Sequence, residues 1–180
     1  MDKVANTAGT YYAYLKAWHR KALLPFTFEL IPYTRGTTKC YCFHEDAENV
    51  IGKKCFDIIY LDPPYNERSY AHYYHLPETL ALGGTPEVHG KSGMPDVDKP
   101  VSDFNRPRDA RGAFERLLRR ARFRLLAFHY SDDGLIDPHD VMDILSLYGN
   151  VEDFNLSSKG YTTSKVMRTV RHHLYVVQHA

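Results

Sequence analysis

The stretch FDIIYLDPPYNERSY (residues 56–70) begins with an apolar run and changes at Asp62 to a polar, proline-containing segment. Residues 56–61 are nearly all apolar, as expected of a strand that is buried on both faces of a parallel sheet. Asp62 follows, and after it come two prolines and a tyrosine. In an open α/β sheet, ligands bind beyond the carboxyl ends of the strands. The stretch therefore predicts a sheet strand that ends at a ligand site.

The corner that follows this strand offers hydrogen-bond acceptors and no backbone donors. Pro63 and Pro64 lack an N–H and have a fixed φ, whereas the Asp62 carboxylate and the Pro63 carbonyl accept hydrogen bonds. Two acceptors in a rigid frame suit a group with two N–H donors, such as the exocyclic amine of adenine. Tyr65 could stack on the base, which is worth about 1–3 kcal/mol in nucleic-acid sites. The alternative is an ordinary strand-ending turn with a surface tyrosine.

The remaining pattern alternates strands with helices, which predicts an α/β fold with a mostly parallel sheet. Two final strands have no helical pattern between them, which predicts an antiparallel C-terminal hairpin. The predicted helices are residues 11–22, 45–51 (a short helix or a turn), 69–82 (interrupted at Pro77), 110–121 and 138–148, the last with Asp137 as its cap and Gly149 closing it. The predicted strands are residues 26–33, 39–44, 56–61, 123–131, 151–156 and 171–178.

The length predicts one domain over residues 1–180, with a core of its own. Residues 83–107 are rich in glycine and proline, and we expect them to form a long flexible loop within that domain. Eight arginines between Arg106 and Arg124 are interpreted as the exposed face of a helix rather than as a strip that faces DNA.

Composition excludes several classes of protein. No stretch reaches the roughly 18 apolar residues of a membrane span, and the net charge of +1 gives no overall attraction to nucleic acid. Three cysteines are an odd number, which favours reduced thiols and a cytoplasmic location. Cys40 and Cys42 lack a second pair at ligand spacing, and His72 and His75 lack a clear third ligand, so no metal site is predicted.

Residues 57–82, DIIYLDPPYNERSYAHYYHLPETLAL, resemble the catalytic region of the Dam-like (class D) DNA adenine-N6 methyltransferases. Residues 6–23 and 128–151 are similar to two further segments of that family, although Tyr130-Ser131-Asp132-Asp133 departs from its Ser-Tyr-Asn-Ser-like turn. The family pattern that follows Asp-Pro-Pro-Tyr is matched here by Asn66, Arg68, Tyr70, Tyr74 and His75. The resemblance implies a partial Rossmann-like methyltransferase fold that uses S-adenosylmethionine.

The resemblance also implies roles for individual residues. Asp62 and its neighbours would bind the target amine of a flipped adenine, Arg68 would reach a phosphate beside it, and Asp46 would contact the cofactor, although a helix cap explains Asp46 equally well. The implied catalytic residues are Asp62, Pro63, Pro64 and Tyr65; the cofactor-binding residues are Asp46 and Asp62; the substrate-binding residues are Tyr65, Asn66 and Arg68. Lys159 joins the substrate-binding residues on composition, because the loop SSKGYTTSKVMR (residues 157–168) is basic and hydroxyl-rich, as loops at a DNA backbone often are; an ordinary hairpin loop is the alternative.

A glycine motif of that family has no counterpart in this sequence. The family carries Phe-x-Gly-x-Gly at the end of its first strand, but none of the eleven glycines here is followed by another two positions later. We favour a shortened reading frame that opens at Met1; a second polypeptide or an unusual order are the alternatives. We therefore expect weak or no binding of S-adenosylmethionine by this chain alone, and a missing N-terminal portion, a second chain or a homodimer as its partner.

The function implied is site-specific methylation of adenine N6 in DNA, as in restriction–modification systems. One alternative is an inactive remnant that binds DNA or a partner, which an exposed apolar surface would favour. The other is methylation of adenine in RNA, which the residues do not exclude.

Overall fold

The computed structural model describes residues 23–25, 27, 29, 30, 32–89, 94, 95, 101–159 and 169–178. They belong to two compact units, one drawn from Met1–His44 and Ala71–Asp98 and the other from Glu45–Tyr70 and Lys99–Ala180. The predicted helix over residues 11–22 lies outside the described residues. The expectation of one domain over residues 1–180 stays a prediction.

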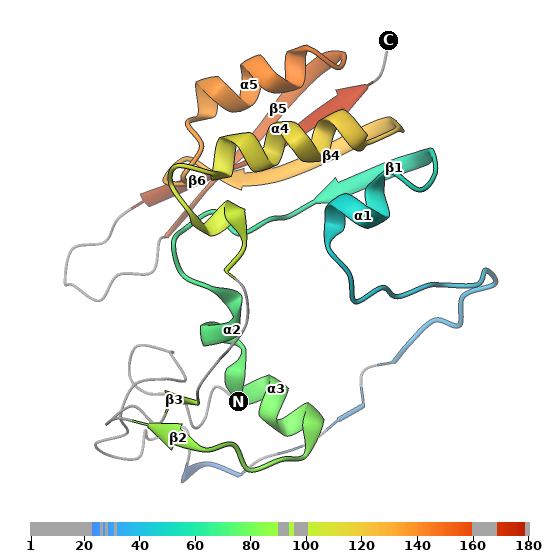
Figure 1. The fold of residues 1–180 in the computed structure, drawn as a ribbon. Coiled ribbons are helices and arrows are strands. Elements are labelled where there is room, and N and C mark those ends of the chain that lie inside the picture. The colour runs from blue at the N-terminus through green and yellow to red at the C-terminus, as the bar shows by residue number, and fades with distance from the viewer. Residues whose placement is uncertain are drawn as a thin grey trace. The chain divides into compact units, whose positions relative to one another are not determined.

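A four-stranded sheet organises the second unit (Figure 1). Its strands are β1 (Phe56–Leu61), β4 (Phe123–Ser131), β5 (Asn150–Lys159) and β6 (Thr169–Gln178), in the order β1-β4-β6-β5. β1 pairs parallel with β4, and β6 pairs antiparallel with both β4 and β5. The fold is therefore mixed α/β.

The prediction of a mostly parallel sheet is wrong for these strands, because two of the three pairings are antiparallel. Only residues 160–168 separate β5 from β6, and a parallel crossover needs a dozen or more residues. The predicted C-terminal hairpin is confirmed. Its second strand, β6, lies between β4 and β5 and is antiparallel to both of them.

Two helices cover one face of this sheet (Figure 1). α4 (Ala110–Arg120) lies where residues 110–121 predict a helix, and its apolar face buries Ala110, Ala113, Phe114, Leu117 and Leu118, whereas Ala121, on the same predicted face, is only partly buried. α5 (Pro138–Ser146) has the predicted cap, since the Asp137 carboxylate accepts from the His139 N–H at 2.8 Å. The predicted end at Gly149 is wrong, because α5 ends at Ser146 with Leu147 as its C-cap.

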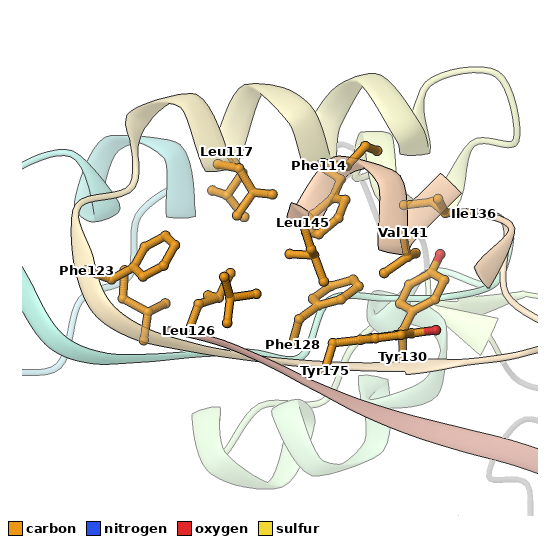
Figure 2. Close-up of a cluster of buried hydrophobic side chains, with 14 of the residues drawn as sticks. Phe114, Leu117, Phe123, Leu126, Phe128, Tyr130, Ile136, Val141, Leu145 and Tyr175 are labelled. Carbon is orange, nitrogen blue, oxygen red and sulfur yellow. The ribbon is translucent and has the colours of Figure 1, made fainter. Parts of the chain in front are cut away.

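The core between helices and sheet is built on stacked aromatic rings (Figure 2). Phe114 of α4 stacks on Phe128 of β4, with ring centroids 4.3 Å apart and planes inclined by 21°. Phe128 also stacks with Tyr130 at 5.2 Å and with Tyr175 of β6 at 6.2 Å. All four side chains are almost completely buried. These rings connect α4 to the two central strands.

β1 has the predicted bounds but not the predicted burial. Only Ile59 is buried, whereas Ile58 and Tyr60 are 66% and 60% exposed. β1 lies at the edge of the sheet, and its alternate side chains face away from α4 and α5. The prediction of a strand buried on both faces is therefore wrong in the described structure.

The described part of the first unit has less regular structure than predicted. Residues 39–44 form no strand: Tyr41 stacks on Phe43 at 6.5 Å as in an extended chain, but the described residues offer them no partner strand. The strand predicted at 26–33 lies partly outside the described residues, and those described there form none. α2 (Tyr70–Tyr73) and α3 (His75–Leu82) break at Tyr74, and Pro77 lies in the first turn of α3, where proline is tolerated.

Other short elements complete the described chain. The helix predicted at 45–51 is α1 (Ala47–Ile51). Within residues 83–107, β2 (Val88–His89) pairs with β3 (Met94–Pro95), and Asp103–Asn105 forms the 3₁₀ helix η2. The flexibility of residues 83–107 stays a prediction. No helix in the described ranges has the length and apolar content of a bilayer crossing.

Replacing Phe114 by alanine is expected to lower the free energy of unfolding by about 3–5 kcal/mol, because it removes a ring from the centre of the core. Urea unfolding at neutral pH measures this loss. Leu147→Ala is the control: Leu147 is 81% exposed, so a change within about 0.5 kcal/mol is expected. A loss below 1 kcal/mol for Phe114→Ala would contradict the described core.

Two buried phenols predict a loss of stability at alkaline pH. Burial raises the pKa of Tyr175, and the carboxylates of Asp153, Asp137 and Asp132 raise it further. Burial also raises the pKa of Tyr130, and the nearby backbone of Ile136 and Leu135 offsets part of this rise. The Tyr130 hydroxyl is buried and forms no hydrogen bond with the described residues. In the unfolded chain a tyrosine loses its proton near pH 10. The unfolded state then binds fewer protons than the folded state, so the free energy of unfolding falls as pH rises above that value.

Tyr175→Phe is expected to reduce this alkaline decline by up to about 1.4 kcal/mol per pH unit, because the variant has no proton to lose at this position. The measurement is urea unfolding at pH 7 and at two values above pH 10. Near pH 7, where both phenols are protonated, the free energy of unfolding should change with pH in nearly the same way in the wild type and in the variant. Parallel declines above pH 10 would contradict the raised pKa.

Candidate functional site

The candidate site lies in the second unit, at the carboxyl end of β1. Leu61, the last residue of β1, pairs with Phe128 of β4. The residues that follow them, Asp62 and His129, therefore lie side by side. Their side chains meet: His129 Nδ1 lies 3.0 Å from Asp62 Oδ1. The Asp62 side chain is 51% exposed and that of His129 is 29% exposed. The predicted acceptor is thus reachable from solvent and is held by a neighbouring strand.

A second imidazole lies behind this pair. His172 of β6 stacks on His129 with centroids 5.3 Å apart and planes inclined by 20°. The same His172 ring meets Tyr65 edge-on, with centroids 6.2 Å apart. Asp62 and Tyr65, which the sequence predicts to bind and stack on a base, are therefore linked through two histidine rings.

The loop after β4 supports Tyr65 from the other side. The Leu135 N–H donates to the Tyr65 carbonyl at 3.0 Å, and the Tyr65 ring meets Tyr130 edge-on at 6.3 Å. Gly134 is needed here, because a Cβ at this position would collide with the Tyr130 ring and with the Ser131 carbonyl. The loop after β4 thus contacts the corner through the backbone N–H of Leu135.

A buried asparagine anchors the residues after Tyr65. Asn105 of η2 is 4% exposed, and its Nδ2 donates to the Asn66 carbonyl at 2.7 Å and to the Arg68 carbonyl at 3.0 Å. The Asn66 carboxamide in turn accepts from the Arg68 N–H at 3.0 Å. The Arg68 side chain is exposed. This region presents Arg68 from a backbone that is held in place.

The other predicted site residues lie on separate elements. Asp46 caps α1 by accepting from the Glu48 N–H at 2.9 Å and remains exposed. Lys159 is the last residue of β5, and its side chain lies outside the described residues. Pro63 and Pro64 are half-buried between Asp62 and Tyr65. The structure thus brings Asp62, Tyr65, Asn66 and Arg68 into one region, and their roles stay predictions.

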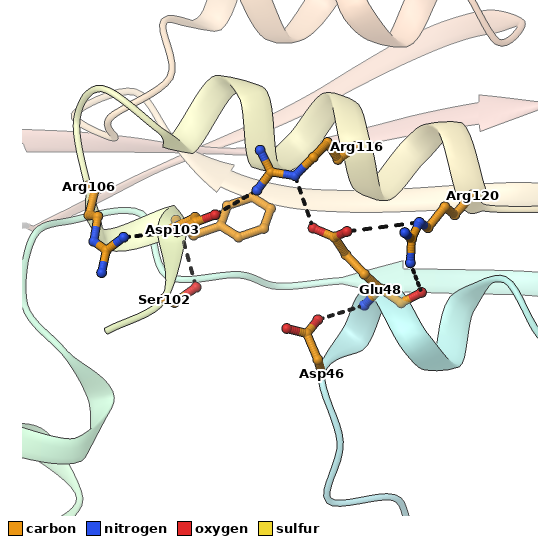
Figure 3. A network of polar contacts seen from close by, with 8 residues as sticks. Asp46, Glu48, Ser102, Asp103, Arg106, Arg116 and Arg120 are labelled. Atoms are coloured by element: carbon orange, nitrogen blue, oxygen red, sulfur yellow. Dashed lines mark hydrogen bonds and ion pairs between the residues drawn. The ribbon is translucent and has the colours of Figure 1, made fainter. Parts of the chain in front are cut away.

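Ion pairs occupy much of the arginine-rich helix (Figure 3). Arg116 Nη2 donates to Asp103 Oδ2 at 2.6 Å, and Arg116 Nε donates to Glu48 Oε1 at 3.4 Å. These contacts join α4 to η2 and α1. The arginines that pair with carboxylates are Arg106, Arg111, Arg116, Arg120 and Arg124. This pairing favours an exposed helix face rather than a strip that faces DNA.

A carboxylate and a proline carbonyl at an exposed corner, beside a tyrosine, can accept the hydrogens of an amine on a planar base. The family profile of the D12 class N6 adenine-specific DNA methyltransferases matches residues 1–130. The chain belongs to this family. The match includes the corner and most of β4, and it confirms the family predicted from the sequence.

Curated relatives agree with this assignment. The chain is 34% identical over 162 residues to the type II methyltransferase M.FokI of Planomicrobium okeanokoites, a match that covers 90% of this chain and 25% of M.FokI. It is 37% identical over 155 residues to M.CviAII of Paramecium bursaria Chlorella virus 1, and 34% identical over 151 residues to M.NlaIII of Neisseria lactamica. Each of these two matches covers 84% of this chain and 45% of the relative. The chain thus spans less than half the length of these methyltransferases. No solved structure matches it significantly.

Sequence reasoning missed three residues of the site: His129, His172 and Asn105. Each reaches the corner or the residues just after it from a distant part of the chain, so no local motif contains it. A signal existed for His129, because a histidine follows the apolar run LLAF of the strand FRLLAFHYS, one residue beyond the partner of Leu61. The register of β1 with β4 would have identified it.

Replacing Asn105 by alanine is expected to lower the free energy of unfolding by about 1–3 kcal/mol, because the carbonyls of Asn66 and Arg68 lose a buried donor. Urea unfolding measures the loss, and hydrogen exchange should accelerate in residues 66–69. Asn155→Ala, at an exposed position of β5, is the control and should change stability by no more than about 0.5 kcal/mol. Unchanged exchange in residues 66–69 would contradict the anchoring role.

Proposed function

We propose that this chain is the adenine-binding, catalytic part of a site-specific DNA adenine N6-methyltransferase. The observation that carries the proposal is the Asp62 carboxylate: it stands at the carboxyl end of β1, half-exposed, with Oδ1 held by His129. Ligands of open α/β sheets bind at this end of the strands. Family membership supports the same chemistry and a DNA substrate, and the relatives are named as type II methyltransferases.

Asp62 and Pro63 would accept the two hydrogens of the adenine amine. When both hydrogens are bound in this way, the nitrogen lone pair is drawn out of the conjugation of the ring and becomes nucleophilic. Pro64 keeps the corner rigid, and Tyr65 would stack on the base. A base inside a duplex cannot reach such a site, so the target adenine must be flipped.

Contacts to the rest of the DNA would come from side chains around the corner. Arg68 is exposed beside the anchored backbone and would pair with a phosphate next to the flipped base. Asn66 would support it, and Lys159 would add a further contact to the DNA backbone. The proposed partners are therefore DNA and a polypeptide segment that carries the glycine-rich cofactor motif, on this protein, on a second chain or on a second copy.

S-adenosylmethionine, when bound, supplies an electrophilic methyl group. The acids of this chain fit part of its site: Asp46 is exposed and uses Oδ1 for its cap to Glu48, and Asp62 is half-exposed. We propose that these two residues contact the cofactor and that these 180 residues alone bind it weakly. The parallel pair β1–β4, covered by helices on one face, supports a Rossmann-like sheet.

A second candidate is a binding module without activity. The exposed apolar side chains on the sheet face opposite α4 and α5 favour it: Ile58, Tyr60, Phe154 and Leu156 are each more than half exposed. Methylation by the chain would exclude this candidate.

Asp62→Ala is expected to lower adenine methylation by at least about 10–100-fold, because the amine loses a charged acceptor. The measurement is the N6-methyladenine content, by mass spectrometry, of unmethylated DNA incubated with the chain and S-adenosylmethionine. Asp57→Ala is the matched control, since Asp57 lies at the other end of β1 and its side chain is 85% exposed.

A parallel incubation with RNA separates the two nucleic-acid substrates. Equal turnover by the wild type and Asp62→Ala would exclude the role of Asp62. No methylation by the wild type would contradict catalysis by these 180 residues alone.

A further inference from the structure

We propose that His129 is a positioning residue: it holds one oxygen of the Asp62 carboxylate so that the other faces the adenine amine. The inference rests on the proposed function of Asp62. An ionised carboxylate only accepts hydrogen bonds, so the contact of 3.0 Å requires the hydrogen on His129 Nδ1. A neutral or a charged imidazole can provide it.

An exposed aspartate needs such a partner, because the torsion that turns its carboxylate is broad and poorly determined. Asp62 is about half exposed, and the two prolines that follow it fix the backbone but not this torsion. A hydrogen bond from the adjacent strand removes the rotation. Oδ1 is then occupied, and Oδ2 is left as the acceptor for the amine.

The His129 ring is itself held in place. His172 stacks against it at 5.3 Å, and the same His172 meets Tyr65 edge-on at 6.2 Å. The two groups proposed to contact the base are therefore fixed relative to one another by two imidazoles on β4 and β6. A change at His129 would alter the direction of the acceptor while the stacking ring keeps its place.

A purely structural role and a positioning role of the pair predict different results. Exposed ion pairs contribute only about 0–1 kcal/mol to stability, and both side chains here are partly exposed. A structural role would alter the unfolding midpoint. A positioning role alters discrimination for the amine and leaves the midpoint nearly unchanged.

The first experiment examines the contact without any substrate. Long-range ¹⁵N–¹H NMR of the histidine rings should show hydrogen on His129 Nδ1, and Asp62→Ala should shift both ring nitrogens of His129. The exposed pair His139–Asp143, at 3.2 Å, is the internal control and should not respond. An unprotonated His129 Nδ1, or a spectrum unaffected by Asp62→Ala, would overturn the inference.

The second experiment measures recognition of the amine. The probes are two oligothymidine strands, one with a single central deoxyadenosine and the other with the purine deoxynucleoside that lacks the 6-amino group. We expect the wild type to bind the first more tightly and Asp62→Ala to lose this preference. His129→Phe keeps a ring for the stack but has no donor, and should reduce the preference by about tenfold. His129→Asn retains an N–H near the position of Nδ1 and should keep most of it.

The outcomes separate this inference from the proposed function. If Asp62→Ala loses the preference and His129→Phe keeps it, the inference fails and the role of Asp62 stands. If Asp62→Ala keeps the preference, or the wild type shows none, the proposed amine contact fails and the inference fails with it. Urea unfolding of each variant confirms that it is folded, and a rescue by His129→Asn that is absent in His129→Phe supports positioning.

Discussion

The parallel register of β1 against β4 is the constraint on which the rest of the second unit depends. Alternate residues of a strand point to opposite faces, so this register places Ile59 beside Leu126 in the core and sends the next residues to the other face. Phe128 then packs beneath α4, while its neighbour His129 meets Asp62 at the end of β1. One alignment of two strands therefore builds the core and assembles the site.

Local patterns predicted the local structure well. The apolar stripe of α4, the cap at Asp137 and the bounds of β1 each depend on residues within a few positions of one another, which is the range over which periodicity and capping act. Strand pairing acts over longer separations. The sequence does not show that β6 lies between β4 and β5, nor that residues 39–44 have no described partner strand.

The candidate site likewise has a part that local sequence predicts and a part that depends on contacts between distant residues. The corner at residues 62–65 could be predicted because its chemistry lies in four consecutive residues: two acceptors, two rigid rings without donors, and an aromatic side chain. Asn105 could not, since it reaches the carbonyls of Asn66 and Arg68 from 39 and 37 residues away along the chain, and His129 becomes evident only once the register of β1 with β4 is known. Burial was overestimated for β1, because an apolar strand reads the same whether it is central or at an edge.

β6 contributes side chains to the site from one of its faces and to the core from the other. His172 faces the site, and the next residues of the same strand, including Tyr175 and Val177, fill the core on the other face. A slip of one residue in a strand exchanges its two faces. An insertion or deletion within β6 would therefore remove the second imidazole and expose the buried phenol together. The spacing along this strand is thus under two independent constraints, one from the site and one from the core.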